Sequence, residues 1–222
     1  MGATAEVMGR HGLDGATIPR IAAHAGLTPG AIYRRFPDKD ALLEAVILRI
    51  LEDQEKMLRA VLTPQMAAGI PLSVLAEQIV SSLLTSYRAH AGLIGAMRRL
   101  VRERRGTAFY RKAVRLENLV IDYMAKLLTE GRSEIQHPEP RRAVALWLLM
   151  VTGLLVEVII DAPDRKAWKK ILPDGDQTLK EEMVRSLEGY LGLPPSTATP
   201  SSTKPGRAKR KGKAEKGSSH MR

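Results

Sequence analysis

Cysteine is absent from this chain of 222 residues, and aromatic residues make up only 4% of it. Without cysteine the protein can form neither a disulfide nor a thiolate metal site, which fits a reducing compartment. Residues 1–15 contain no apolar stretch of the kind that a secretory signal peptide requires. We therefore expect a cytoplasmic protein.

The chain also lacks the usual features of an active site. Its five histidines are scattered, and no nucleophile is paired with a base, no metal-ligand spacing occurs and no glycine loop could hold a phosphate. The sequence therefore predicts no enzyme, no metal and no cofactor.

Alternation of apolar and polar residues, the pattern of a half-buried strand, is missing as well. Proline and glycine instead separate segments in which apolar residues recur three and four positions apart, as on one face of a helix. In the longest of these segments the stripe runs from Leu43 to Met57 and Val61. We predict an all-α fold with helices over residues 3–11, 17–25, 28–36, 38–62, 72–91, 93–104, 107–130, 140–161 and 178–191.

Positive charge is concentrated at the end of the chain. Residues 194–222 carry a net charge of +7 out of the +11 of the whole chain, in a stretch rich in Pro, Ser, Thr, Gly and Lys. Such a segment buries too little apolar surface to offset the entropy of ordering it, so we predict a disordered basic tail. A flexible polycation can add salt-sensitive affinity for DNA, or it can be a solvated end without a role.

Residues 17–36 predict two short helices separated by a tight turn. Thr17 and Thr28 are suited to cap the two helices, and Pro29 takes the first helical position, where its missing N–H costs nothing. Gly26 suits the left-handed position that follows the end of a helix. Two short helices around such a turn form a helix-turn-helix, which we expect to be held together by Ile21, Leu27, Ile32 and Phe36.

The free face of the second helix carries the chemistry of a DNA-binding surface. Small residues at its front let it enter a major groove about 12 Å wide, and the arginines behind them can reach a guanine edge or a phosphate. Lys39 adds a cation in the first turn of the next helix, where a phosphate would also meet free N–H groups. The predicted DNA-binding residues are Thr17, Arg20, Thr28, Pro29, Gly30, Ala31, Tyr33, Arg34, Arg35 and Lys39.

Each of these residues also has a simpler interpretation. Asp38 or Asp40 could neutralise Lys39, and Arg34 and Arg35 could be solvated side chains. Taken one at a time, the residues favour the simpler interpretation, whereas their combination at this spacing favours DNA binding.

Residues 17–42, TIPRIAAHAGLTPGAIYRRFPDKDAL, resemble the DNA-binding domain of the TetR family of bacterial transcriptional regulators. The shared pattern is T-x-x-x-I-A-x-x-A-G-x-x-x-G-x-[LI]-Y-x-x-F-x-x-K-x-x-L. Its positions are filled here by Ile21, Ala22, Ala25, Gly26, Gly30, Ile32, Tyr33, Phe36, Lys39 and Leu42. The resemblance covers about the first 45 residues.

This resemblance implies a fold of roughly nine helices, in which a three-helix head joins a larger body through a long fourth helix. It divides the chain into a helix-turn-helix DNA-binding domain (residues 1–45), a helical ligand-binding and dimerisation domain (46–193) and the basic tail (194–222). It also implies a homodimer in which the last two helices, over residues 140–161 and 178–191, pair with those of a second copy.

The resemblance further implies a pocket for a small effector in the body. Few charged residues lie on the buried faces there, so we expect an apolar or amphipathic effector. The candidate ligand-binding residues are Tyr87, His90, Met97, Phe109, Tyr123, Trp147 and Met150. Each of them is at least as readily interpreted as a core residue.

Residues 143–160 form an apolar run that approaches the length of a membrane span. Glu157 interrupts the run, and a helix that is apolar nearly all round is also what a dimer interface requires. We therefore expect burial between subunits and no membrane contact.

The sequence thus predicts a homodimeric, sequence-specific transcriptional regulator that binds a palindromic operator in double-stranded DNA. We expect a repressor that a small ligand releases, because the ligand favours a body conformation in which the two heads no longer fit successive major grooves. The alternative is a sequence-independent architectural protein that binds DNA through its basic tail.

Overall fold

The computed structural model describes residues 1–161, 170–173 and 175–193, and these residues form helices and no strand. The predicted all-α fold is therefore confirmed. The segment 162–169 and the predicted disordered tail lie outside the described residues. The helices are α1 (Gly2–Gly15), α2 (Ile18–His24), α3 (Pro29–Tyr33), α4 (Lys39–Val61), α5 (Pro64–Ala68), α6 (Leu72–Ala89), α7 (Ala91–Glu103), α8 (Ala108–Thr129), α9 (Pro140–Leu155), the π-helix η1 (Val156–Asp161) and α10 (Gly175–Leu191).

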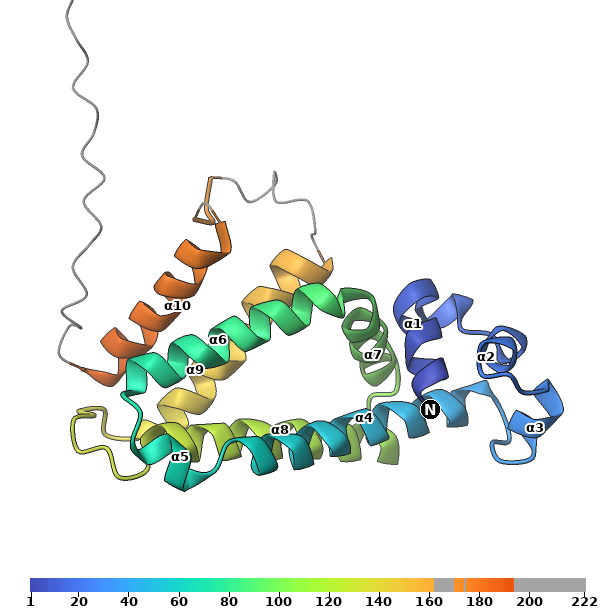
Figure 1. Cartoon of the computed structure of the whole chain (residues 1–222), viewed down its shortest axis with the longest axis horizontal. Helices are drawn as coiled ribbons and strands as arrows, with labels where there is room; N and C mark the ends of the chain where they lie inside the picture. Colours follow the sequence, from blue (N-terminus) through green and yellow to red (C-terminus); the bar gives the residue numbers. More distant parts are fainter. Residues whose placement is uncertain (162–169, 174, 194–222) are drawn as a thin grey trace, which may run out of the picture.

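Helices α1, α2 and α3 form a head at one end of the molecule, and the long helix α4 leads from the head into the body (Figure 1). In the body α4 runs alongside α8, α9 packs against α8 and α10, and α6 packs against α10. Helix α7 connects the body to the head, because it packs against α1 and also against η1.

Five helices begin at a residue whose side-chain oxygen accepts a hydrogen bond from the N–H three positions later. This bond replaces a partner that the first turn of a helix lacks, and it is worth about 1 kcal/mol. The capping residues are Thr17, Thr28, Asp38, Thr63 and Thr107. The first two confirm the caps predicted for the helix-turn-helix.

Some predicted boundaries differ from the structure. Helix α3 ends at Tyr33 rather than at residue 36, and α10 already begins at Gly175. The break predicted after the fourth helix contains the short helix α5. Helix α1 extends to Gly15 but is interrupted at Gly12, whose φ of 65° is left-handed.

Three apolar residues predicted to be buried are exposed. Leu27 lies in the turn and is 53% exposed, so it does not hold the two helices together. Met57 and Val61 are 68% and 60% exposed. Leu58 and Leu62 are half-buried in their place. The predicted stripe therefore no longer coincides with the buried face in the second half of α4.

The buried residues form two clusters, one in the body and one around the head. The head cluster contains Met8, Ile21 and Ile32, and it is completed by residues of α7 and α8, namely Ala96, Leu100, Phe109 and Ala113. The predicted boundary at residue 45 therefore lies within one packed cluster, and the division into domains stays a prediction.

The apolar segment Pro140–Asp161 is long and apolar enough to span a membrane. Its most apolar stretch of 18 residues has a mean hydropathy of 2.5, and half of that stretch is buried inside the protein. Its buried side chains, among them Trp147, Val151 and Leu155, belong to the body cluster. The Trp147 indole Nε1 donates to the carbonyl of Met183 in α10 at 3.1 Å. These contacts are those of a core helix.

Candidate nucleic-acid interface

The turn between α2 and α3 has the geometry predicted for a helix-turn-helix. Gly26 has a φ of 65°, and the N–H of Leu27 donates to the carbonyl of Ala22 at 2.9 Å. Ile21 and Ile32 are buried beneath the turn. Because Ala22 is also buried and has a small side chain, the two helices can pack closely and hold α3 rigidly at the surface.

The outward face of α3 presents the predicted residues to solvent. Thr28, Pro29 and Gly30 at its front are exposed, Ala31 is half-buried, and the ring of Tyr33 is 54% exposed. Arg34 and Arg35 follow at the end of the helix and are also exposed. Neither guanidinium forms an ion pair with any residue that the structure describes. Both are therefore available to phosphates and base edges.

Thr17 and Arg20 are exposed but take part in local hydrogen bonds. The Thr17 hydroxyl accepts from the backbone N–H of Arg20 at 3.4 Å, and the Arg20 guanidinium donates to the carbonyl of Gly15 at 2.5 Å. The first bond caps α2 and the second joins the end of α1 to the start of α2, so the two side chains stabilise the head at the edge of the exposed face.

Lys39 is half-buried, and its Nζ donates to the carbonyl of Leu13 at 2.9 Å. Neither neighbouring carboxylate pairs with it among the described residues, because Asp38 accepts from the N–H of Ala41 and Asp40 pairs with Arg104. One hydrogen bond leaves two N–H groups of the ammonium for another acceptor. Lys39 thus links α4 to α1 and can still meet a phosphate.

The residues that join the head to α7 are not among those predicted from the sequence. Arg99 pairs with Asp14 at the end of α1 at 2.9 Å, and Arg104 pairs with Asp40 and Glu44 in the first turns of α4. A signal was present, since five arginines stand between residues 98 and 105. Their partners are distant in sequence, so the pairs could not be identified.

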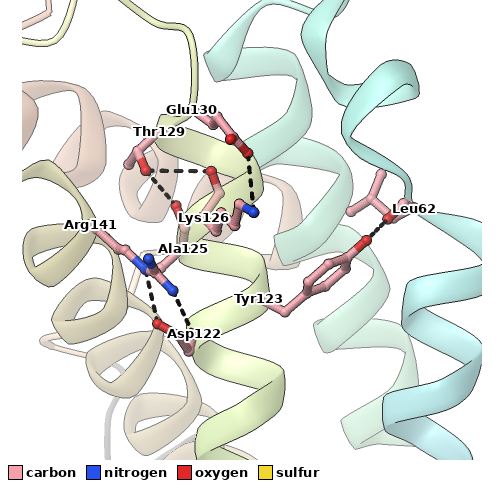
Figure 2. A network of polar contacts seen from close by, with 8 residues as sticks. All are labelled: Leu62, Asp122, Tyr123, Ala125, Lys126, Thr129, Glu130 and Arg141. Carbon is pink, nitrogen blue, oxygen red and sulfur yellow. Dashed lines mark hydrogen bonds and ion pairs between the residues drawn. The ribbon is translucent and has the colours of Figure 1, made fainter.

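The predicted ligand-binding residues are distributed over several parts of the described structure. Tyr123 contacts the end of α4, where its hydroxyl donates to the carbonyl of Leu62 at 2.8 Å (Figure 2). The guanidinium of Arg59 in α4 lies 4.4 Å from the ring centroid of Tyr123. Beside it, Arg141 of α9 donates twice to Asp122 of α8, at 2.9 and 2.6 Å. The polar end of Tyr123 therefore already has a partner.

The other six candidates lie in different surroundings. Phe109 belongs to the head cluster and Trp147 to the body cluster, and both are buried. Tyr87 and Met97 are half-buried, whereas His90 and Met150 are exposed. Among the described residues, no group of three or more His, Asp or Glu side chains could hold a metal ion.

Three polar side chains from α6, α7 and α8 influence one another inside the body. Loss of water raises the pKa of the Tyr87 hydroxyl and of the Glu117 carboxyl, while the nearby Arg98 lowers both pKa values to a lesser extent. Glu117 is nevertheless exposed, so the loss of water around its carboxyl is only partial. Within the described part of the chain, no ion pair joins it to Arg98.

The sequence model of the family 'Bacterial regulatory proteins, tetR family' matches residues 1–46 of this chain. No curated protein matches the chain. Among solved structures, the chain is similar to the fatty acid degradation regulator FadR from Bacillus halodurans, with 19% sequence identity and a TM-score of 0.60, covering 85% of this chain and 95% of that chain.

Two further structures have a similar fold. A transcriptional regulator from Rhodococcus sp. Rha1 has 19% identity and a TM-score of 0.62, covering 87% of this chain and 96% of that chain. The regulator FadR from Bacillus subtilis, solved in complex with stearoyl-CoA, has 16% identity and a TM-score of 0.59, covering 84% and 94%. At such identities the likeness establishes the fold, and the family match concerns the head.

Proposed function

We propose, from the match of residues 1–46 to the tetR family of bacterial regulatory proteins, that the chain is a TetR-family transcriptional repressor that a small molecule releases from DNA. The observation that carries the DNA-binding part is the exposed face of α3. There Tyr33, Arg34 and Arg35 follow a row of small residues, and the two arginines have no ion-pair partner among the described residues.

This face suits DNA for two reasons. The small residues Pro29 and Gly30 let the helix approach the floor of a major groove, and the cations behind them can reach phosphates on its edge. A homodimer would present two such faces, so the operator would be palindromic, with half-sites about one helical turn apart or slightly more.

A binding titration tests this assignment. Fragments selected from genomic DNA on the wild-type protein supply the operator, and a gel-shift titration at fixed salt measures its affinity. The double variant Arg34→Gln/Arg35→Gln should bind at least about tenfold more weakly. The slope of log affinity against log salt should fall by roughly one for each phosphate that the variant can no longer neutralise.

The matched control is Arg105→Gln/Arg115→Gln, which removes the same charge from two exposed arginines outside the head. It should keep the operator affinity within about twofold, because it leaves α3 unchanged. Equal losses in the two double variants would mean that net charge alone governs binding, and would refute the role given to the face of α3.

We also propose a homodimer formed through α9 and α10. Leu146, Leu149 and Met150 stand three and four positions apart on α9 and are all exposed, and Tyr190 of α10 is exposed as well. An apolar stripe on a helix whose other side is already buried is typical of an interface between subunits. A second copy covers it without any membrane.

Sedimentation velocity tests the dimer. The wild-type protein should sediment with twice the mass of the 24.4 kDa chain, and Leu149→Glu should shift it towards the monomer. The control Met57→Glu places the same charge on an exposed apolar residue of α4 and should leave the dimer intact. A Leu149→Glu variant that remains fully dimeric would place the interface elsewhere.

For the effector we propose an apolar or amphipathic small molecule bound in the body. Tyr87, Met97 and Tyr123 are half-buried and can contact a ligand directly, whereas Phe109 and Trp147 can do so only if the core opens. Stearoyl-CoA, held by the structurally similar FadR from Bacillus subtilis, is an amphipath of this class. A regulator of transcription acts on the chromosome, so we place the protein in the cytoplasm.

A further inference from the structure

A hollow of about 350 Å³ lies between α7 and the π-helix η1, away from the face of α3. Its walls include Gly95, Arg98, Arg99 and Arg102 from α7 and Ile160 and Asp161 from η1. A volume of this size lies at the lower end of the range for small-molecule sites in proteins. The hollow therefore has room for a small polar molecule.

The local backbone explains why the two helices can form this hollow. Gly95, Arg98, Arg99 and Arg102 stand at positions i, i+3, i+4 and i+7, so they share one face of α7. An added Cβ at Gly95 would lie 3.1 Å from the Cγ2 atom of Ile160, so glycine lets η1 come close at this point. The turn of η1 is π-helical, a geometry that often accompanies functional sites.

The charge of the hollow is only partly compensated. Arg99 is engaged, because it pairs with Glu103 at 2.8 Å and with Asp14 at 2.9 Å. Arg98 and Arg102 form no ion pair with any residue in the described ranges, although the carboxyl of Glu117 lies near enough to Arg98 for the two charges to interact. The Nε atom of Arg98 is buried and lacks a hydrogen-bond partner within those same ranges.

Two carboxylates line the hollow and oppose this charge, and one of them, Glu103, is paired with Arg99. Asp161 also lines the wall, and it forms no ion pair with the described residues. The hollow thus presents two guanidinium groups and one carboxylate that the described part of the chain leaves without an ion pair. An anion is therefore attracted but not tightly held.

We propose that this hollow is an anion site that binds the acidic group of a small molecule through Arg98 and Arg102. Guanidinium groups donate paired, charge-assisted hydrogen bonds to carboxylate and phosphate oxygens, and either acid provides the required acceptors. The identity of this molecule as the effector rests on the function proposed above, whereas the site itself does not.

Arg99 connects the hollow with the head. The same side chain lines the hollow and pairs with Asp14 at the end of α1. An anion beside it competes with Asp14 for the guanidinium, so occupation of the hollow weakens one of the contacts that hold the head against α7. This gives a bound anion a route to the orientation of the DNA-binding face.

Isothermal titration calorimetry on the full chain without DNA tests the site. Pyrophosphate and succinate serve as separate probes for the phosphate and the carboxylate group, at an ionic strength held constant with chloride. The variant Arg98→Gln/Arg102→Gln should bind the preferred anion at least about tenfold more weakly than the wild type. The variant Asp161→Asn should bind it more tightly, by about threefold or more, because a repelling charge is gone.

The matched control is again Arg105→Gln/Arg115→Gln, which lowers the net charge equally but lies outside the hollow and should bind the anion like the wild type. The single variant Arg102→Gln, at an exposed position, replaces the double variant if the latter unfolds. Equal weakening by the two double variants, or no binding of either probe to the wild type, would overturn the proposal.

The two proposals fail separately. If the selection on genomic DNA recovers no bound fragment, the regulator is refuted, but the calorimetric difference between the variants still supports the anion site. If DNA binds, but Arg98→Gln/Arg102→Gln and Arg105→Gln/Arg115→Gln bind the anion with the same affinity, the anion site is refuted and the regulator stands.

Discussion

The contact between α1 and α7 leads to a sharp prediction at Gly92. A Cβ atom built there would overlap the carbonyl oxygen of Gly9 and lie 3.1 Å from the carbonyl carbon of the same residue. Both atoms belong to the backbone of α1, so no side-chain rotation can relieve the overlap. We therefore expect Gly92→Ala to force α1 and α7 apart.

The magnitude follows from two opposing effects. Alanine in place of glycine within a helix contributes about 1 kcal/mol of stability. Restoring an ordinary contact requires the helices to separate by on the order of 1 Å, which weakens dispersion attraction along the whole interface. Overpacking of this kind costs about 1–3 kcal/mol, and more where backbone must move. We expect a net destabilisation of about 2 kcal/mol, or roughly 4–8 °C in Tm.

The residue across the contact provides the control. A Cβ at Gly9 would lie 3.5 Å from the Cβ of Leu93, an ordinary van der Waals contact, and Gly9 is also helical. Gly9→Ala should therefore be neutral or stabilise the protein by up to about 1 kcal/mol. Urea unfolding at equilibrium measures both variants. A Gly92→Ala protein as stable as Gly9→Ala would refute the close approach of the two helices.

Two further predictions concern the body. Burial raises the pKa of Glu117 above its value in the unfolded chain, so the associated stability is complete below about pH 4.5 and is lost as the pH rises through the folded pKa. Glu117→Gln should therefore melt above the wild type at pH 7.5, and calorimetric scans in which the difference fails to shrink at pH 4.5 would contradict this. The buried Arg132 donates to the carbonyls of Ala67 and Ile70 at 3.0 and 2.8 Å, so Arg132→Met should lose about 2–4 kcal/mol in urea unfolding. The exposed control Arg142→Met should lose less than about 0.5 kcal/mol, and similar losses in both variants would show that the carbonyls do not depend on Arg132.

The head could be predicted from the sequence because its determinants are local. Thr17 and Thr28 cap the helices that they precede, and Gly26 takes the left-handed conformation that ends α2. Each of these features depends on a few neighbouring residues, so a single short segment contains the information. Leu27 shows the limit of this reasoning, since apolarity alone does not tell whether a turn residue faces the core or the solvent.

The body and the anion site could not be predicted in the same way. Arg99 meets Asp14, and Arg104 meets Asp40, although these pairs are far apart in the chain. Helical periodicity assigns a residue to a face but does not say which other helix covers that face. The seven predicted ligand-binding residues lie in or near two clusters and at the surface, and periodicity alone could not distinguish these surroundings.

The packing of α7 has a consequence for how the head can move. Ala96 and Leu100 of α7 lie in the same buried cluster as Met8 and Ile21 of the head, and Gly92 meets α1 backbone to backbone. Close-packed contacts of this kind do not stretch continuously, so a shift of α7 must either carry the head with it or break the cluster. A ligand in the body can therefore reorient the DNA-binding face without touching it. This requires that the ligand binds with different affinity to two conformations of the protein that differ in the position of α7.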